Sequence, residues 1–157
     1  MAATYEPIAT ATPNGVTEYT FSSISGSYTD LVLVGSIICA SSSGNLYLRF
    51  NGVTSGTYCR IYLSRSNATN YNGDATSIDI GDASSASLNS FVLNINNYSA
   101  TTLKHKHAFG YHGWEGGAYN IGGSLDTTSA ITSITIGSSS PNIVSPSRLT
   151  LYGITRA

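Results

Sequence analysis

Short runs of alternating apolar and polar residues recur along the whole chain. In residues 46–50 and 91–95, Leu or another large apolar residue stands at every second position. No window keeps apolar residues at helical spacing for three turns, because Gly, Ser, Thr and Asn interrupt every candidate. This pattern predicts β-strands with one buried face and one polar face.

One segment departs from this alternation. Residues 31–34, inside the predicted strand 30–40, are apolar at every position. A continuous apolar, β-branched run is typical of a strand that is buried on both faces. With this strand included, the pattern predicts about ten strands, at residues 5–10, 16–21, 30–40, 46–50, 58–63, 78–80, 91–95, 102–111, 131–136 and 148–155.

The segments between the strands carry turn signals. Asn14-Gly15 and Asn51-Gly52 are dipeptides that favour tight turns, since both residue types tolerate positive φ. Residues 64–75, 113–123 and 138–147 are rich in Asn, Gly, Ser or Pro, and we expect them to be loops. Most gaps are too short for parallel crossovers. We therefore predict one domain over residues 1–157, an antiparallel two-sheet β-sandwich that is jelly-roll-like.

The alternation also predicts the core of this sandwich. A chain of 157 residues buries enough surface to fold without disulfides or metals. We expect the two cysteines, Cys39 and Cys59, to be buried free thiols. The residues predicted to be mostly buried are Leu31, Leu33, Leu48, Phe50, Leu93, Ile95, Ile134, Leu149 and Leu151.

Charged residues are scarce. Only 10% of the residues are Asp, Glu, Lys or Arg, against a norm of about 25%. Charged residues are depleted in the cores of interfaces, so this composition favours a protein that shares surface with neighbours; the alternative is a monomer with a hydroxyl-rich surface. The net charge of -1 provides no basic stripe for a nucleic acid. We expect no signal peptide, because the N-terminal residues have neither a basic region nor an apolar core, and the longest apolar run is too short to span a membrane.

The first ten residues could take part in such sharing. Pro7 disfavours a central strand position because proline has no N–H to donate. Residues 1–10 are therefore expected to form an edge strand or an assembly arm, in which Tyr5, Pro7 and Ile8 reach a neighbouring subunit.

The sequence offers few candidates for catalytic or metal-binding residues. His105 and His107 would share one face of a strand and could begin a zinc site with His112 as a third ligand. The alternative is an exposed or interfacial strand whose rings pack beside Phe109, and we favour it. Catalytic motifs and phosphate-cradling loops do not occur in the sequence, and the acidic residues stand apart. We predict that the chain is not an enzyme and that it binds neither a metal nor a cofactor.

One glycine-rich segment gathers several rings. Tyr111, Trp114 and Tyr119 lie close together beside His112, and the glycines among them would let a loop 111–119 present the rings to a ligand or partner. The alternative is that Trp114 closes the end of the sandwich as a buried plug.

Several segments resemble a known group of proteins when they are taken together in order. They are YEPIAT (5–10), FSSISGSYTDLVLV (21–34), LRFNG (48–52), INNY (95–98), AITSITI (130–136) and LTLYGI (149–154). The chain resembles small structural proteins of tailed bacteriophages over nearly its whole length, except at residues 64–90 and around Trp114.

The resemblance implies a β-sandwich protein of the virion, made in the host cytoplasm. It implies a capsid decoration or cement protein that contacts itself, as a homotrimer, and the major capsid protein or another virion protein. The alternative that the resemblance leaves open is a tail-associated receptor- or carbohydrate-binding module.

Overall fold

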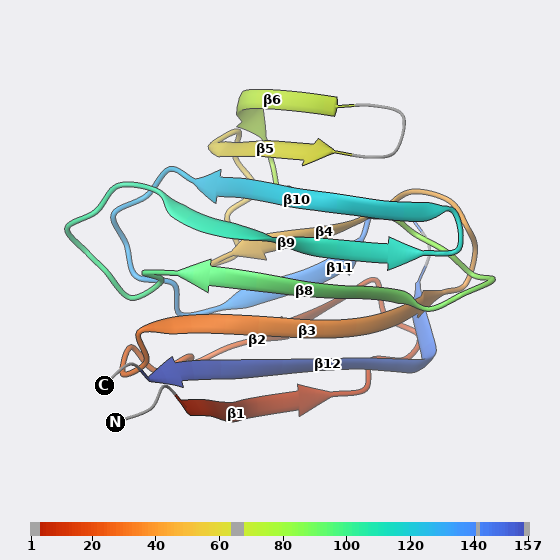
Figure 1. Cartoon of the computed structure of the whole chain (residues 1–157), viewed down its shortest axis with the longest axis horizontal. Coiled ribbons are helices and arrows are strands. Elements are labelled where there is room, and N and C mark those ends of the chain that lie inside the picture. Colours follow the sequence, from red (N-terminus) through yellow and green to blue (C-terminus); the bar gives the residue numbers. More distant parts are fainter. Residues whose placement is uncertain (1–3, 64–67, 141, 156–157) are drawn as a thin grey trace.

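The computed structural model describes residues 4–63, 68–140 and 142–155, which form twelve strands and no helix. All strand pairs are antiparallel, and they form two sheets of eight and four strands. In Figure 1 the larger sheet A lies in front of the smaller sheet B. Sheet A has the order β1 (Thr4–Ala11), β12 (Ile143–Thr155), β3 (Asp30–Cys39), β8 (Asn89–Asn96), β9 (Lys106–Trp114), β10 (Gly117–Leu125), β5 (Tyr58–Leu63) and β6 (Ala68–Ala75).

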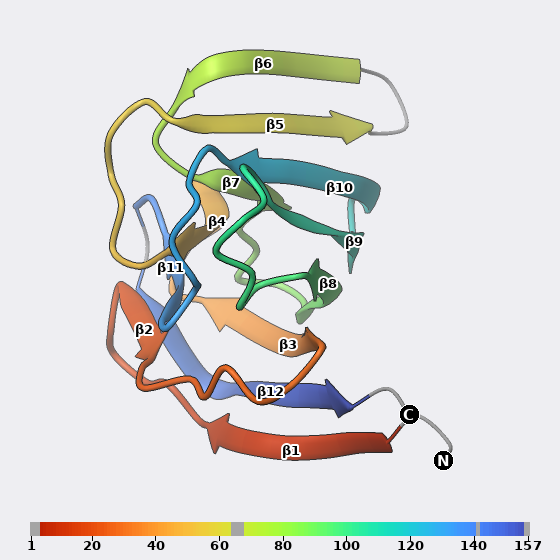
Figure 2. The ribbon, with the colours of Figure 1, turned by 90° about the vertical axis from the view of Figure 1, so that its left-hand side faces the viewer.

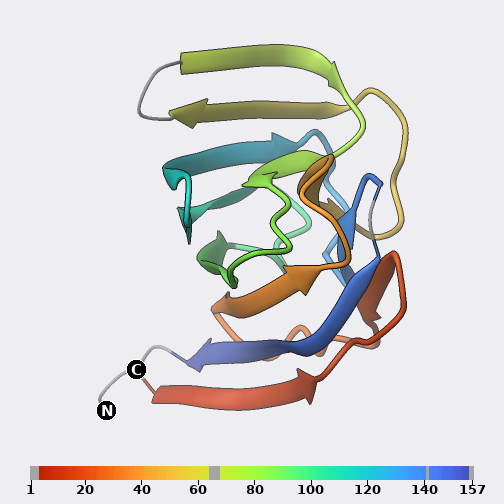
Figure 3. The ribbon, with the colours of Figure 1, turned by 90° about the vertical axis from the view of Figure 1, so that its right-hand side faces the viewer.

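Sheet B covers only the middle of sheet A. Figures 2 and 3 show sheet A curving around sheet B, so that β1 at one edge and β5 and β6 at the other extend beyond it. The order of sheet B is β2 (Glu18–Phe21), β11 (Ile134–Ser138), β4 (Asn45–Phe50) and β7 (Ile78–Asp82). This architecture confirms the predicted all-β, antiparallel sandwich.

The facing sides of the two sheets form the core. All nine residues predicted to be buried have no exposed surface. The packing is close enough to select glycine at one point: a Cβ at Gly35 would lie 2.1 Å from the ring of Phe91, which packs over it from the neighbouring strand. The alternation of apolar residues therefore identified the inward face of each predicted strand correctly.

Asn51 and Gly52 form the predicted tight turn, with φ values of 52° and 66°, and the N–H of Val53 donates to the carbonyl of Phe50 at 3.0 Å. The turn is not the loop of a hairpin, because it leads from β4 in sheet B to β5 in sheet A. Tyr58 of β5 fastens this crossing: its buried hydroxyl accepts the N–H of Phe50 at 2.8 Å.

The structure corrects three of the predicted loops. Residues 68–75 and 117–125 are the strands β6 and β10, and β12 begins at Ile143, inside the predicted loop 138–147. Their Gly, Ser and Asn residues are poor strand formers by propensity. They are extended here because neighbouring strands supply their backbone hydrogen bonds, which the residue types alone do not reveal. Residues 64–67 of the first predicted loop lie outside the described residues.

The strand predicted at residues 102–111 begins later, at Lys106. His105 has a φ of +72°, which is incompatible with an extended strand. The buried ammonium of Lys106 donates to the carbonyls of Ala100 and Leu103 and so closes the preceding loop. Burial lowers the pKa of Lys106. From here on the predicted alternation holds: Lys106 and Ala108 face inward, and His107 and Phe109 face outward.

The N-terminal segment forms an edge strand, which is one of the two expected arrangements; the other was an assembly arm. β1 pairs with β12 of the same chain, with an irregularity between Pro7 and Ala9, and lies at the edge of sheet A. Tyr5 is exposed and its ring meets that of Tyr152 edge-on, whereas Ile8 packs against the core. The two cysteines are free, Cys39 fully buried and Cys59 only partly. Burial raises the pKa of the Cys39 thiol.

Candidate functional site

The outer face of sheet A is not covered by any strand of sheet B, which packs on the opposite side (Figures 2 and 3). The strand register places its outward residues in two rows that cross six neighbouring strands from β12 to β5, a width of about 24 Å at about 4.8 Å per strand. The first row is Tyr152, Val32, Asn94, Phe109, Gly122 and Ile61, and the second is Thr150, Val34, Val92, Tyr111, Asn120 and Leu63. We call these twelve residues the apolar face.

The apolar face contains no Asp, Glu, Lys, Arg or His. Six of its large apolar side chains are substantially open to solvent, with exposed fractions from 38% for Val34 to 69% for Tyr111. Val34 also corrects an expectation, because the run 31–34 predicted burial on both faces. Val32, which also faces outward, is buried at 5% exposed, so within one chain the outward side of this strand is covered only in part.

A groove crosses the apolar face above β10. Gly122 has no side chain and stands in the row between Phe109 and Ile61, so these two residues form walls above a low floor. The groove has a volume of about 570 Å³. His107, Asn96 and Ser124 also line it, so amide, imidazole and hydroxyl groups surround an otherwise apolar depression.

The residues proposed to form a ring-bearing loop are separated by the structure. Residues 111–119 are not a loop but the end of β9, a tight turn and the start of β10. Because side chains alternate along a strand, Tyr111 is on the apolar face, whereas His112 is on the inward side, 1% exposed. Tyr119, opposite His112 in the register, is half-buried.

His112 and Tyr119 form a buried polar group at the end of the core. Their rings stack with centroids 5.6 Å apart and an interplanar angle of 6°. The Nε2 of His112 lies 3.3 Å from Oδ1 of Asn89, and the hydroxyl of Tyr119 donates to Asp82 at 2.5 Å. Burial lowers the pKa of His112 to about 4, against a small opposing effect of the Asp82 charge.

Trp114 is the last residue of β9, directly before the turn that leads into β10, and is partly buried. Its ring packs on Gly116, where an added Cβ would come within 2.3 Å of it. The neighbouring Glu115 accepts a hydrogen bond from Ser84 at 2.8 Å. This packing is closer to the alternative in which Trp114 closes the end of the sandwich than to a ring that is presented to a ligand. Among Tyr111, His112, Trp114 and Tyr119, only Tyr111 is well exposed.

His105 and His107 do not meet His112. The ring centroids of His105 and His107 are 6.3 Å apart. His112 is on the opposite side of sheet A, so the three histidines considered as zinc ligands do not converge. In residues 4–63, 68–140 and 142–155, no three His, Cys, Asp or Glu side chains gather as a metal-binding group. The same residues contain no helix long and apolar enough to cross a membrane.

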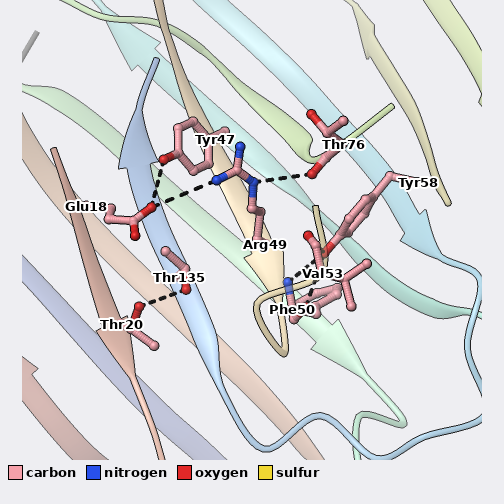
Figure 4. A network of polar contacts seen from close by, with 9 residues as sticks. All are labelled: Glu18, Thr20, Tyr47, Arg49, Phe50, Val53, Tyr58, Thr76 and Thr135. Carbon is pink, nitrogen blue, oxygen red and sulfur yellow. Dashed lines mark hydrogen bonds and ion pairs between the residues drawn. The ribbon is translucent and has the colours of Figure 1, made fainter. Parts of the chain in front are cut away.

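The outer face of sheet B is polar, in contrast to sheet A. Figure 4 shows Arg49 between Glu18 and Thr76. Its guanidinium lies 3.9 Å from the Glu18 carboxylate and donates to the Thr76 carbonyl at 3.3 Å. The same guanidinium lies 4.2 Å from the ring centroid of Tyr47, whose hydroxyl donates to Glu18 at 3.0 Å.

Sequence reasoning did not single out this network or the apolar face. The network joins β2, β4 and the residues before β7, which the sequence does not show to be neighbours. The two-residue period of each strand already indicated that residues 32, 34, 92, 109 and 111 would face away from the core. That they form one continuous apolar surface follows only from the order in which six strands pair in sheet A. Comparison of the chain with family models, curated protein sequences and solved structures yields no match.

Proposed function

We propose that this chain is a structural protein of a tailed-bacteriophage virion, a decoration or cement protein that stabilises the shell through contacts with its own copies and with capsid subunits. The apolar face of sheet A is the observation that carries the proposal. The phage context comes from the sequence resemblance.

An exposed sheet face with no charged residue is costly for a protein that stays alone in water. Large exposed apolar patches mark interaction sites, and charged residues are what interface cores exclude. Val34 belongs to a run with the composition of a strand buried on both faces, yet it is 38% exposed in a single chain. A partner on the apolar face would supply the second cover that a single chain lacks.

The partner that we propose first is another copy of the chain, in a trimer. Closed symmetry is the usual outcome for identical subunits, and a three-fold assembly matches the three-fold positions of an icosahedral shell. With no charged residue on the apolar face, association should be nearly independent of ionic strength between low and moderate salt.

Light scattering on the purified chain tests self-association. We expect a mass about three times 16.4 kDa. Val92→Lys, in the middle of the apolar face, should convert the assembly to monomers, because it buries an unpaired charge at the interface. Leu88→Lys is the matched control, since Leu88 is 44% exposed against 41% for Val92 but lies outside the apolar face.

Electron cryomicroscopy of the complete particle tests the location. The proposal predicts many ordered copies on the shell with sheet A turned towards a neighbouring subunit. A strict monomer at high concentration whose only density in the particle is at the tail tip would refute the decoration function. Equal effects of the two lysine substitutions would refute the role of the apolar face.

A further inference from the structure

A polar groove lies beside sheet B, away from the apolar face. It has a volume of about 640 Å³. Its lining is almost entirely polar: hydroxyl, amide, guanidinium and carboxylate groups come from four strands and from the residues before β7. The polar side chains of its lining include Asn45, Tyr47, Arg49, Arg60, Ser77 and Asp79.

The charges of this groove are balanced in pairs. Arg60 of β5 reaches from sheet A to Asp79 of β7 in sheet B, with 2.7 Å between Nη1 and Oδ2. Arg49 stands beside Glu18, as described above. Counted together with Glu18, which stands beside the groove and does not line it, two guanidinium groups and two carboxylates leave no net charge, while they keep many directed donors and acceptors.

The groups are also held in place before any ligand arrives. The ring of Tyr47 packs on Gly137, where an added Cβ would come within 2.4 Å of the ring. Arg49 is fixed between that ring and the carbonyl of Thr76. Asp79 is only 8% exposed and is anchored by Arg60. A preorganised set of polar groups loses little conformational entropy on binding.

We propose that this groove is a binding site for a neutral saccharide. Sugar hydroxyls both donate and accept, and they match planar guanidinium, carboxylate and amide groups that carry no net charge. An anion such as phosphate would need guanidinium groups that are not already neutralised. An apolar peptide would need the large apolar walls that this groove lacks.

The site is independent of the proposed assembly. Apart from Arg60 of β5, its lining residues belong to sheet B or to the loops beside it, so a chain docked through the apolar face of sheet A would still present the groove. In a decoration protein this would give the particle a weak affinity for polysaccharide surfaces. The inference does not depend on that function, because the groove belongs to a single chain.

The test is an NMR titration of the ¹⁵N-labelled chain with three neutral probes: maltotriose, the trimer of N-acetylglucosamine, and mannotriose. Inorganic phosphate and sialyllactose are titrated in parallel. We expect at least one neutral probe to shift the signals of Arg49, Arg60 and Asp79, with a dissociation constant of about 0.1–10 mM, as for a small weak ligand.

Two variants identify the site. Asp79→Asn removes the charged acceptor and Ser77→Ala removes one hydroxyl, and each should weaken binding of that probe, about tenfold or more for Asp79→Asn. Ser77→Ala keeps the test valid if Asp79→Asn disturbs folding. Lys104→Gln is the control, because it breaks the exposed Lys104–Asp126 pair of 3.1 Å, which is not part of the groove.

Three results would overturn the inference. One is that no neutral probe shifts these signals at about 10 mM, where even weak sugar binding is visible. Another is that phosphate or sialyllactose binds there more tightly than every neutral probe. The third is that Ser77→Ala binds the best neutral probe as tightly as Lys104→Gln does.

Discussion

His112 should make this protein lose stability in mild acid. Its ring is 1% exposed, stacked on Tyr119, and places Nε2 beside the amide oxygen of Asn89. That oxygen accepts, so Nε2 carries the proton of the neutral ring, and an additional proton must enter at Nδ1. Nδ1 is buried without a hydrogen-bond partner among the described residues, next to Gly81. A cation there would be desolvated and unpaired.

The pKa values give the size and the sign of the effect. The pKa of His112 falls from 6.5 to about 4 on folding. The unfolded chain therefore binds the proton more readily, and acid favours unfolding. The stability associated with the neutral ring is complete above about pH 6.5 and is lost as the pH falls towards about 4. At about pH 5 the loss is about 2 kcal/mol relative to about pH 7.5.

The assay is urea unfolding at several pH values between about 5 and 7.5, followed by fluorescence of the single Trp114 and by circular dichroism. His112→Gln keeps an amide donor near Nε2 but cannot titrate. Its free energy of unfolding should vary with pH by about 2 kcal/mol less than that of the wild type. His107→Gln, at an exposed position, is the matched control for a histidine-to-glutamine substitution.

Two results would refute this reasoning. Parallel pH profiles of the wild type and His112→Gln would show that the buried ring contributes no linkage. An NMR titration in which the His112 ring protonates near its ordinary pKa of about 6.5 would show that burial does not hold it neutral.

Three substitutions test the packing and the link between the sheets. Leu93→Ala should reduce the free energy of unfolding by about 2–5 kcal/mol through the cavity it leaves, and a loss under about 0.5 kcal/mol would contradict its place in the core. Tyr58→Phe should cost about 1–3 kcal/mol because the buried N–H of Phe50 loses its partner; an unchanged urea midpoint would argue against this bond. Gly35→Ala should cost about 1–3 kcal/mol by displacing the ring of Phe91, and full wild-type stability would show that the ring moves freely.

The inward side of the sandwich was readable from the chain. The period of a strand is two residues, so Leu48 and Phe50, or Leu93 and Ile95, had to share a face, and burial of apolar area selected that face. The tight turn at Asn51-Gly52 followed from local sterics in the same way. Each of these features depends on residues close together in sequence, which is why the sequence alone sufficed.

The strands β6 and β10 could not be predicted from their own residue types. Their Gly, Ser and Asn residues have no strong preference for an extended backbone. The hydrogen bonds that β5 and β9 offer to β10 come from segments far away in the sequence or across a turn, and their contribution exceeds the weak local preference.

The candidate surfaces were decided by tertiary structure for the same reason. The order of sheet A aligned Val34, Val92 and Tyr111 in one row, and it turned His112 into the core while leaving Tyr111 outside. The sequence determined which residues along each strand share a face. Which strands stand side by side, and therefore whether a face is apolar, polar or covered, depended on pairings between distant segments, such as the one that brings Arg60 to the carboxylate of Asp79.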